Sequence, residues 1–309
     1  MKFAHTSVLV QESMGLLKPR AGERYLDGTL GGGGHAEELL LRSSPDGRVL
    51  GLDRDEDALQ AAAQRLSRFG DRLTLRQANF DQAKEILADI NWNQVNGVLL
   101  DLGVSSHQFD TPERGFSFQA SAPLDMRMDR RQRLTASEIV NSFPEAEVTK
   151  IISDYGEEPR ARRIAAAIAT ERKERRIETT LDLADLVARV KRKRDRAHHP
   201  ATRTFQALRI AVNREMESLK QFLEYGFELL QPGGRMVIIS FHSLEDRLVK
   251  TAFRKWSDKC ICPPRTLKCE CGWSQKAQRL TRKPIIASAE EVRANPRARA
   301  AKLRAAVRL

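Results

Sequence analysis

The sequence of 309 residues has few cysteines, few aromatic residues and no long apolar run. All four cysteines lie between positions 260 and 271, so we expect no disulfide framework in the rest of the chain. No apolar stretch approaches the roughly 18 residues that a membrane-spanning helix needs, and the chain begins with no hydrophobic signal segment. These absences predict a cytoplasmic protein that does not associate with membranes.

Glycine is concentrated at one place, between Asp27 and His35, where four consecutive glycines occupy positions 31 to 34. An acidic residue closes a short apolar strand there, and a helix is expected after the glycines. Glycines gather in this way where the backbone takes positive φ angles or lies against a ligand. The next apolar strand, 48–53, ends in Asp53 about twenty residues on, where a βαβ unit presents a carboxylate to ribose hydroxyls. This arrangement predicts a nucleotide-type cofactor site.

Two cofactors fit such a site. The segment from Gly31 to Ala36 satisfies the loose dinucleotide pattern G-x-G-x-x-A, which is a weak signal alone. Asp27 and Gly28 at the strand end, ahead of the glycine run, are typical of S-adenosylmethionine-dependent methyltransferases. A nicotinamide dehydrogenase would also need a hydride-transfer site, and no residues indicate one. The pattern favours S-adenosylmethionine, with the dehydrogenase as the alternative.

Apolar patterning in the first hundred or so residues alternates between strands and helices. The strands are expected at 24–27, 48–53, 73–78 and 95–101. Such alternation predicts a parallel, doubly wound α/β sheet. Taken with the methyltransferase-like strand end at Asp27 and Gly28, the expected sheet is of the Rossmann-like class I methyltransferase type. Ligands bind such sheets beyond the carboxyl ends of the strands, which is where the following residues fall: Asp27, Asp53, Phe80 and Asp101.

After the fourth strand the pattern changes to helices only, the last of them at 201–217, and a strand pattern returns at 235–240. The simplest explanation is an insertion. We expect a mostly helical substrate-recognition domain at 105–210, inserted into a methyltransferase domain formed by 1–104 and 211–309.

The positive charge behind the net charge of +12 is concentrated in two parts of the chain, outside the glycine-rich strand–helix region that is predicted to hold the cofactor. Residues 105–210 carry +5 and residues 247–309 carry +13, whereas the remaining segments are slightly acidic. Two basic regions beside a nearly neutral catalytic unit predict a polyanionic partner, with nucleic acid as the obvious candidate. Clusters of Arg and Lys at 160–176 and 189–194 suit phosphate contacts. The basic tail from about residue 260 lacks apolar periodicity, so we expect much of it to be extended or ordered only by its ligand.

Nine segments of the chain together resemble one protein family. They are His5–Leu9, Asp27–Thr29, Gly33–His35, Asp101–Ser106, Arg114–Phe118, Pro123–Met128, His199–Ala207, Ser240–Arg247 and Asn295–Arg299. In this order they are similar to the bacterial small-subunit ribosomal RNA cytosine-N4 methyltransferases, the MraW family, over nearly the whole chain. The resemblance implies methylation of the exocyclic N4 amine of a cytidine in the decoding region of 16S ribosomal RNA. It also implies that the partner is the small-subunit RNA or the ribosomal subunit.

Together with the strand-end pattern, the resemblance implies cofactor roles for eight residues: Asp27, Gly33, Gly34, His35, Asp53, Phe80, Asp101 and Gln108. Backbone amides of the glycines can approach the methionine moiety closely, and Asp53 can accept two hydrogen bonds from the ribose diol. Phe80 either packs on the adenine face or belongs to the core. His35 either contacts the cofactor or only caps a helix.

Methyl transfer to a cytosine amine needs acceptors that hold its N–H bonds, because the nitrogen lone pair is delocalised into the ring. Asp101 is the best-placed carboxylate, and Ser105 and Ser106 are expected to assist it. His242 follows the strand at 235–240, and it either faces the substrate or precedes a charged helix start. Exocyclic-amine methyltransferases often carry Asp/Asn-Pro-Pro-Tyr/Phe, whereas this chain has Asp-Leu-Gly-Val, so another phenylalanine has to stack on the base. The candidates are Phe109, Phe116, Phe118 and Phe241.

The cysteines bear on which atom is methylated. Methylation at C5 of cytosine generally requires a cysteine nucleophile, whereas attack by the amine requires none, and every cysteine lies in the polar tail. Ribose 2′-O methylation stays open. The four thiols of Cys260, Cys262, Cys269 and Cys271 either form a tetrahedral zinc site or remain free. A non-catalytic ribosome-assembly factor is a further alternative, and the presence of the acidic and glycine cofactor residues argues against it.

Overall fold

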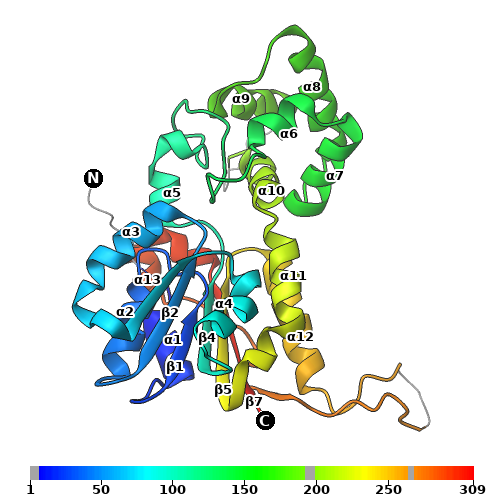
Figure 1. Cartoon of the computed structure of the whole chain (residues 1–309). Coiled ribbons are helices and arrows are strands. Elements are labelled where there is room, and N and C mark those ends of the chain that lie inside the picture. Colours follow the sequence, from blue (N-terminus) through cyan, green and yellow to red (C-terminus); the bar gives the residue numbers. More distant parts are fainter. Residues whose placement is uncertain (1–6, 192–198, 264–267) are drawn as a thin grey trace. The chain divides into compact units, whose positions relative to one another are not determined.

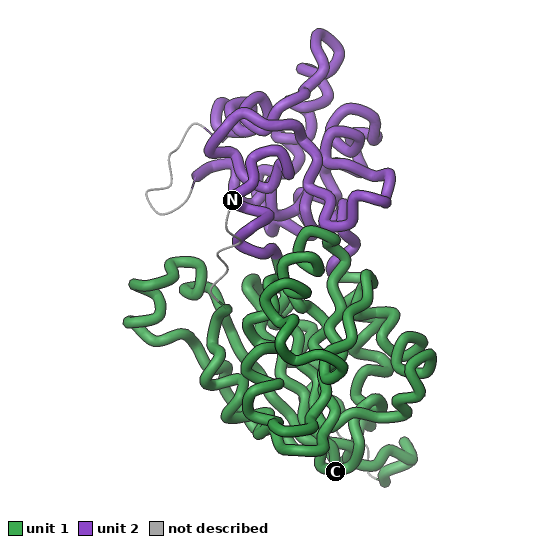
Figure 2. The backbone as a smooth tube through the Cα atoms, turned by 60° about the vertical axis from the view of Figure 1, so that its left-hand side comes forward, with its two compact units in different colours: residues 1–103, 216–309 green, residues 104–215 purple. Residues whose placement is uncertain are grey.

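The computed structural model describes three stretches of the chain, residues 7–191, 199–263 and 268–309. The chain forms two compact units. Unit 1 comprises residues 1–103 and 216–309, and unit 2 comprises residues 104–215 (Figure 2). No described helix is long and apolar enough to cross a membrane.

The chain returns from unit 2 to unit 1 at residues 215–216, where the sequence predicted a single helix over 201–217 and the structure has two. Helix α10 (Thr202–Asn213) ends at Arg214, whose φ of 50° is left-handed, and α11 (Glu215–Tyr225) begins directly after it. The side chain of Asn213 helps to fix this end of α10, because its Oδ1 accepts a hydrogen bond of 2.8 Å from the backbone N–H of Met128. The sequence pattern predicted one continuous helix here, since the apolar spacing continues across the break.

Unit 1 is built on a seven-stranded sheet with the order β3-β2-β1-β4-β5-β7-β6 (Figure 1). Strands β1 to β5 run parallel, β7 runs antiparallel to β5, and β6 runs antiparallel to β7. The strands are β1 Arg24–Asp27, β2 Arg48–Asp53, β3 Leu73–Gln77, β4 Val95–Asp101, β5 Leu230–Ser240, β6 Ala277–Arg279 and β7 Lys302–Arg308. This strand order with one reversed strand confirms the predicted Rossmann-like class I methyltransferase sheet.

The tail is more ordered than the sequence pattern predicted. Strands β6 and β7 complete one edge of the sheet, and Leu303, Ala305 and Ala306 of β7 are fully buried. Arg304 on the same strand pairs with Asp246 at 2.7 Å. Pairing with β5 and burial of small side chains order this arginine-rich segment, although its periodicity was too weak to indicate a strand. These strands are extended, as expected for much of the tail, but pairing within the sheet orders them, so the expected need for a ligand is wrong for these residues.

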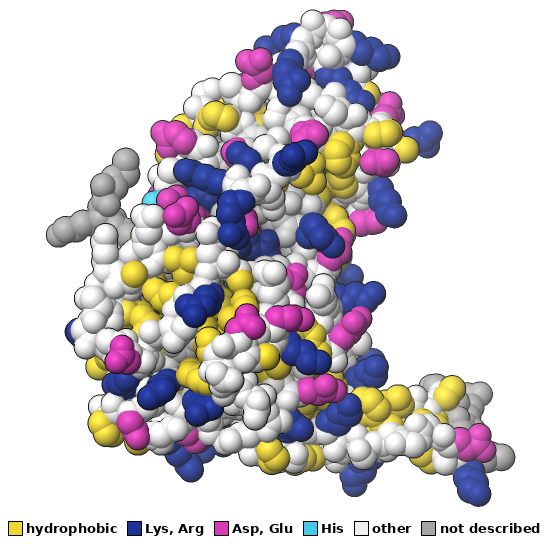
Figure 3. All heavy atoms as spheres, viewed as in Figure 1, with side chains coloured by type: hydrophobic (Ala, Val, Ile, Leu, Met, Phe, Trp, Pro, Cys, Tyr) yellow, Lys and Arg dark blue, Asp and Glu magenta, His cyan; other side chains and the backbone are white. Residues whose placement is uncertain are grey.

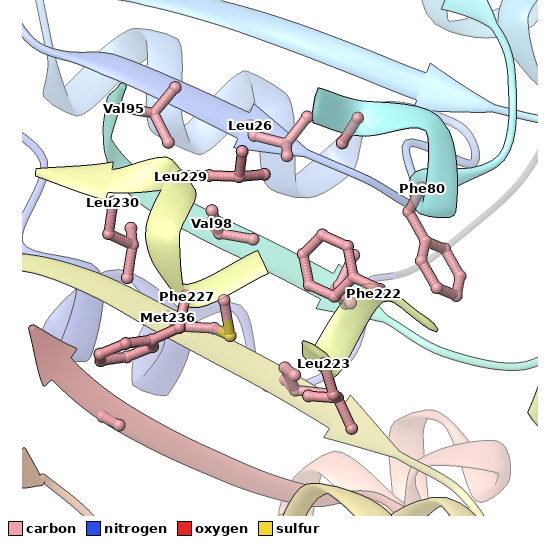
Figure 4. Close-up of a cluster of buried hydrophobic side chains, with 14 of the residues drawn as sticks. Leu26, Phe80, Val95, Val98, Phe222, Leu223, Phe227, Leu229, Leu230 and Met236 are labelled. Atoms are coloured by element: carbon pink, nitrogen blue, oxygen red, sulfur yellow. The ribbon is translucent and has the colours of Figure 1, made fainter. Parts of the chain in front are cut away.

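Helices of unit 1 cover both faces of the sheet (Figure 1). Besides α11 they are α1 Val10–Leu17, α2 Gly34–Arg42, α3 Glu56–Arg65, α4 Ala83–Asp89, α12 Ser243–Ser257 and α13 Ala289–Ala294. Side chains of β4 alternate between the two faces, as a strand requires. Leu99 belongs to one buried cluster, whereas Val98 and Leu100 belong to another with Phe222 and Met236, part of which is shown in Figure 4.

Unit 2 is helical and has its own hydrophobic core. Its helices are α5 Ser106–Asp110, α6 Ala136–Ser142, α7 Glu145–Gly156, α8 Ala161–Glu174, α9 Thr180–Lys191 and α10. The core includes Ile139, Ile152, Ile164 and Leu208. Arg114 is also buried, with 2% of its surface exposed, and its guanidinium donates a hydrogen bond of 3.1 Å to the carbonyl of Met128. A charge buried in this way is held by carbonyl acceptors, so this arginine stabilises the loop before α6.

Short 3₁₀ turns join several elements of both units. They are Ser67–Arg72, Phe80–Gln82, Pro112–Arg114, Gly226–Leu229 and Pro296–Ala300.

Candidate active site

Three carboxylates of unit 1 end neighbouring strands of the sheet. Asp27 closes β1, Asp53 closes β2 and Asp101 closes β4. Because β2, β1 and β4 are adjacent and parallel, their carboxyl ends lie at the same edge. This is the edge at which doubly wound sheets bind ligands.

The glycine turn between β1 and α2 borders this edge. The backbone N–H of Gly31 donates a hydrogen bond of 2.8 Å to Asp53 Oδ2, which ties the turn to β2. Gly33 has a φ of 79°, a conformation that favours glycine. A Cβ atom on Gly34 would lie 2.1 Å from the Ser7 hydroxyl oxygen, and one on Gly33 would lie 2.9 Å from Leu66. Close packing thus requires both glycines, and the predicted contact of their amides with a cofactor stays a prediction.

Asp27 is fully buried, with its carboxylate receiving one hydrogen bond of 3.2 Å from the backbone N–H of Thr29. Its second oxygen, Oδ2, has no hydrogen-bond partner among the described residues. Burial, with a smaller contribution from the charge of Asp53, raises the pKa of Asp27 to about 7. Burial also raises the pKa of Asp53 to about 6, although that carboxylate accepts hydrogen bonds from the backbones of Gly31 and Asp55.

Asp101 is held at the end of β4 by its backbone. Its N–H donates a hydrogen bond of 2.5 Å to the Thr29 hydroxyl, and only 12% of its side chain is exposed. Its Oδ1 has no hydrogen-bond partner among the described residues. The pKa of Asp101 is raised well above its ordinary value by burial and then by the charges of Asp27 and Glu245. Thr29 is a site residue that the sequence patterns did not single out, and its position in Asp-Gly-Thr was the only signal for it.

His35 lies in the first turn of α2 and is 4% exposed. Its Nε2 lies 3.0 Å from the carbonyl oxygen of Val8, so Nε2 carries the proton of the neutral ring. Nδ1 then faces Asp101 Oδ2 at 3.8 Å with its lone pair. This contact links His35 to the Asp101 carboxyl and makes it more than a helix cap, whereas a direct cofactor contact stays a prediction.

Phe80 belongs to the hydrophobic core of unit 1. It is 7% exposed and meets Phe222 edge to face, with ring centroids 5.6 Å apart (Figure 4). Its backbone begins the turn after β3, at the carboxyl edge. Most of the Phe80 ring therefore belongs to the core, which was one of its two predicted roles. Packing of its remaining exposed edge on adenine stays a prediction.

His242 caps helix α12. Its Nδ1 accepts from the backbone N–H of Glu245 at 3.5 Å, and its Nε2 lies 3.1 Å from Glu245 Oε1. The Glu245 carboxylate in turn accepts from the backbone N–H of His242 at 3.3 Å, which completes a capping box, and also from the backbone N–H of Phe241 at 2.8 Å. With 8% of its side chain exposed, His242 has a clear local role, and its predicted part in the reaction stays untested.

Ser105, Ser106 and Gln108 lie in unit 2, at the start of α5. Ser105 Oγ accepts from the backbone N–H of Gln108 at 3.2 Å, and Gln108 Oε1 accepts from the backbone N–H of Ser105 at 3.0 Å. Ser106 and Gln108 are 8% and 4% exposed. The described contacts of Ser105 and Gln108 thus cap a helix, and the predicted catalytic and cofactor roles of all three remain predictions.

The four phenylalanines considered for base stacking differ in exposure. Phe109 is 36% exposed, whereas Phe116 is 5% exposed and packs in the core of unit 2. Phe118 stacks on His199 and meets Phe205 edge to face, and Phe241 packs against a cluster of unit 1. Phe109 therefore has the most exposed ring surface of the four.

The sheet and the acidic edge with its glycine turn are those of a class I methyltransferase. The chain belongs to the MraW methylase family, whose model matches residues 2–309. It is 52% identical to the ribosomal RNA small subunit methyltransferase H of Symbiobacterium thermophilum, over 100% of this chain and 98% of that protein. It is 53% identical to the protein of the same name from Geobacter sp. strain M21, over 98% and 97% of the two chains. A solved structure, a putative rRNA methylase from Clostridium thermocellum, aligns with a TM-score of 0.46 at 14% identity, covering 99% of this chain and 100% of that one.

Proposed function

We propose that this protein transfers a methyl group from S-adenosylmethionine to the exocyclic N4 amine of a cytidine in the decoding region of 16S ribosomal RNA. The name of its relatives supports the small-subunit RNA as substrate. The observation that carries the proposal is the acidic edge of the sheet, where Asp27 Oδ2 and Asp101 Oδ1 are buried without a partner among the described residues. Most buried polar atoms bond to protein, ordered water or a ligand, so these two oxygens have acceptor capacity that a bound ligand can use.

The acidic edge fits the proposed cofactor. S-adenosylmethionine has an ammonium group, a sulfonium centre and a ribose diol, and each of them complements a carboxylate. Asp27 and Asp101 would hold the positive methionine moiety, and Asp53 would accept hydrogen bonds from the ribose. The raised pKa values of these carboxyls fit the same role, because a cationic ligand stabilises the charged forms that burial disfavours. When bound, the cofactor supplies an electrophilic methyl group.

Asp101 is the residue that would act on the cytosine. Its Oδ1 can accept an N–H bond of the amine and thereby orient the nitrogen for in-line attack. The amine must also lose a proton, and a carboxylate whose pKa is raised well above normal accepts one more readily. His35 Nδ1, 3.8 Å from the other oxygen of Asp101, would orient that carboxyl once it is protonated.

The position of the cysteines weighs against methylation at C5. That chemistry needs a thiolate at the base, and all four thiols lie together in the segment after α12, within 4.8 Å of one another.

The identity of the methylated nucleoside tests the proposed reaction. Ribosomal RNA from cells with and without the protein is digested and its nucleosides are analysed by mass spectrometry. We expect N4-methylcytidine to appear only with the protein, and a methyl group on carbon 5 or on the ribose would refute the proposed reaction.

RNA phosphates are the proposed contacts of the basic surface of unit 2, where Lys and Arg side chains are interspersed with acidic ones (Figure 3). Some of the arginines predicted to contact phosphates already bind other residues of unit 2. Arg175 and Arg189 both pair with Glu171, and Arg160 donates to the carbonyl of Lys191. Arg162 and Arg163 on α8 are exposed and are therefore better candidates than Arg160.

Replacement of both Arg162 and Arg163 by alanine should flatten the salt dependence of RNA binding. Each lost phosphate contact reduces the slope of log K against log salt by about 0.7 to 0.9. The matched control replaces Arg42 and Arg68, two exposed arginines of unit 1, and should leave the slope unchanged. Binding is measured by fluorescence anisotropy with a small-subunit RNA fragment. An equal slope in the α8 variant and the wild type would place the RNA contacts elsewhere.

A further inference from the structure

All four cysteines lie between the end of α12 and the start of β6. The described parts of this segment, residues 258–263 and 268–276, extend away from the body of unit 1 (Figure 1). Of its described residues only Trp273 packs against a hydrophobic cluster, and Ile261 is 41% exposed. Its base is closed by a hydrogen bond of 3.0 Å from Trp273 Nε1 to the carbonyl of Asp258. Apolar burial therefore orders the base of the segment but does not account for the order of its outer part.

The thiols gather in this outer part. The Sγ atom of Cys260 lies 3.5 Å from that of Cys269 and 3.7 Å from that of Cys271. Cys269 and Cys271 are 3.6 Å apart, and Cys262 lies 4.0 Å from Cys269. These sulfurs are too far apart for disulfides, whose S–S bond is about 2.05 Å.

The separations match the edges of a thiolate tetrahedron. Zinc binds cysteine sulfur at about 2.3 Å, so two sulfurs of a tetrahedral site lie about 3.8 Å apart. The four separations given above, 3.5 to 4.0 Å, bracket that value. All four sulfurs lie within 4.8 Å of one another, so one ion can contact all of them.

The surrounding backbone and charges suit a metal bound by thiolates. The backbone N–H of Cys262 points to Cys260 Sγ at 3.4 Å, the kind of hydrogen bond that stabilises a ligating sulfur. Gly272 has a φ of 58° and turns the chain directly after Cys271. Lys259 and Lys268 each precede a cysteine, and their positive charges would offset the net charge of −2 of four thiolates around a divalent ion.

We propose that Cys260, Cys262, Cys269 and Cys271 form a closed, structural zinc site that orders the segment between α12 and β6. With four protein ligands the ion has no open position, so its role is to hold the chain and not to activate a substrate. Binding requires loss of the thiol protons and leaves the oxidation state of sulfur and metal unchanged. The site goes beyond the proposed methyl transfer and does not depend on it.

Metal content tests the proposal directly. The full-length protein is purified under reducing conditions without chelator and analysed by inductively coupled plasma mass spectrometry. We expect about one zinc per chain. Cys262→Ser and Cys271→Ser should each lower the zinc content to background, whereas Ser274→Ala, an exposed change on the same segment, should retain it.

Cobalt and trypsin give two readouts that do not depend on the variants being soluble. Replacement of the metal in wild-type protein by Co²⁺ should produce the intense visible absorption of tetrahedral thiolate coordination. Lys259 and Lys268 are exposed, so metal removal should speed trypsin cleavage after them by loosening the backbone, and added zinc should slow it again. Iron in place of zinc, or metal-free protein with four freely titrating thiols and no cobalt spectrum, would overturn the proposal.

Discussion

Asp101→Ala is expected to lower methyl transfer by about 100-fold or more at saturating cofactor, the usual scale for a positioned acid–base group. The substitution removes the buried Oδ1 that we propose as acceptor for the cytosine N–H, and the carboxyl that His35 faces at 3.8 Å. Turnover is measured with an RNA substrate and labelled S-adenosylmethionine. Cofactor affinity is measured separately by calorimetry, because the same carboxylate is proposed to face the methionine moiety.

The melting temperature of the variant shows whether the loss of methyl transfer comes from the missing carboxyl or from unfolding. Burial raises the pKa of Asp101 above its value in the unfolded chain, so ionisation of this carboxyl favours the unfolded state at any pH above that unfolded value. Removal of the carboxyl should therefore not lower the melting temperature at neutral pH. Asp101→Asn keeps the shape of the side chain and should lose activity as well, because an amide cannot take the proton. Asp89→Ala, an exposed carboxyl in α4, is the control that should keep full activity. Full activity in Asp101→Ala would remove that residue from the reaction.

The sequence patterns predicted the sheet well because its parallel strands are continuous apolar runs separated by amphipathic helices. They failed where tertiary contacts decide the structure. β7 is rich in arginine and alanine and is ordered by pairing with β5, and Arg214 interrupts an apolar stripe that continues through it. Neither feature leaves a periodic signal.

The sequence shows where the site residues lie more readily than it shows what each of them binds. A carboxylate at a strand end is visible in the sequence, which is why Asp27, Asp53 and Asp101 were found. The sequence does not show which atoms are already bonded. Only the structure shows that His242 caps α12 and that Asp101 keeps a buried oxygen without a described partner.

Asp53→Ala should weaken S-adenosylmethionine binding by about 1.5 to 3 kcal/mol, roughly 10- to 150-fold, the scale of charge-assisted hydrogen bonds. We propose that this carboxylate holds the ribose diol, and it also fixes the glycine turn through Gly31. Calorimetry measures the affinity. Asp53→Asn separates the two roles, because it keeps an acceptor oxygen for the turn without the charge, and Glu56→Ala is a control with the same charge change on the exposed side of α3.

The pH dependence of cofactor binding gives Asp53 a signature that a structural role would lack. Burial raises the pKa of Asp53 to about 6, and the charged form is the one proposed to bind, so the contribution of Asp53 to affinity should fall as the pH drops through 6. Asp27, with a pKa of about 7, should add a separate decline that begins at higher pH. In Asp53→Ala the contribution of Asp53 to this decline should disappear. The contribution of Asp27 should persist but move to lower pH, because the charge of Asp53 helps to raise the pKa of Asp27. Unchanged affinity at pH 8, or an unchanged pH profile, would show that Asp53 is not a cofactor ligand.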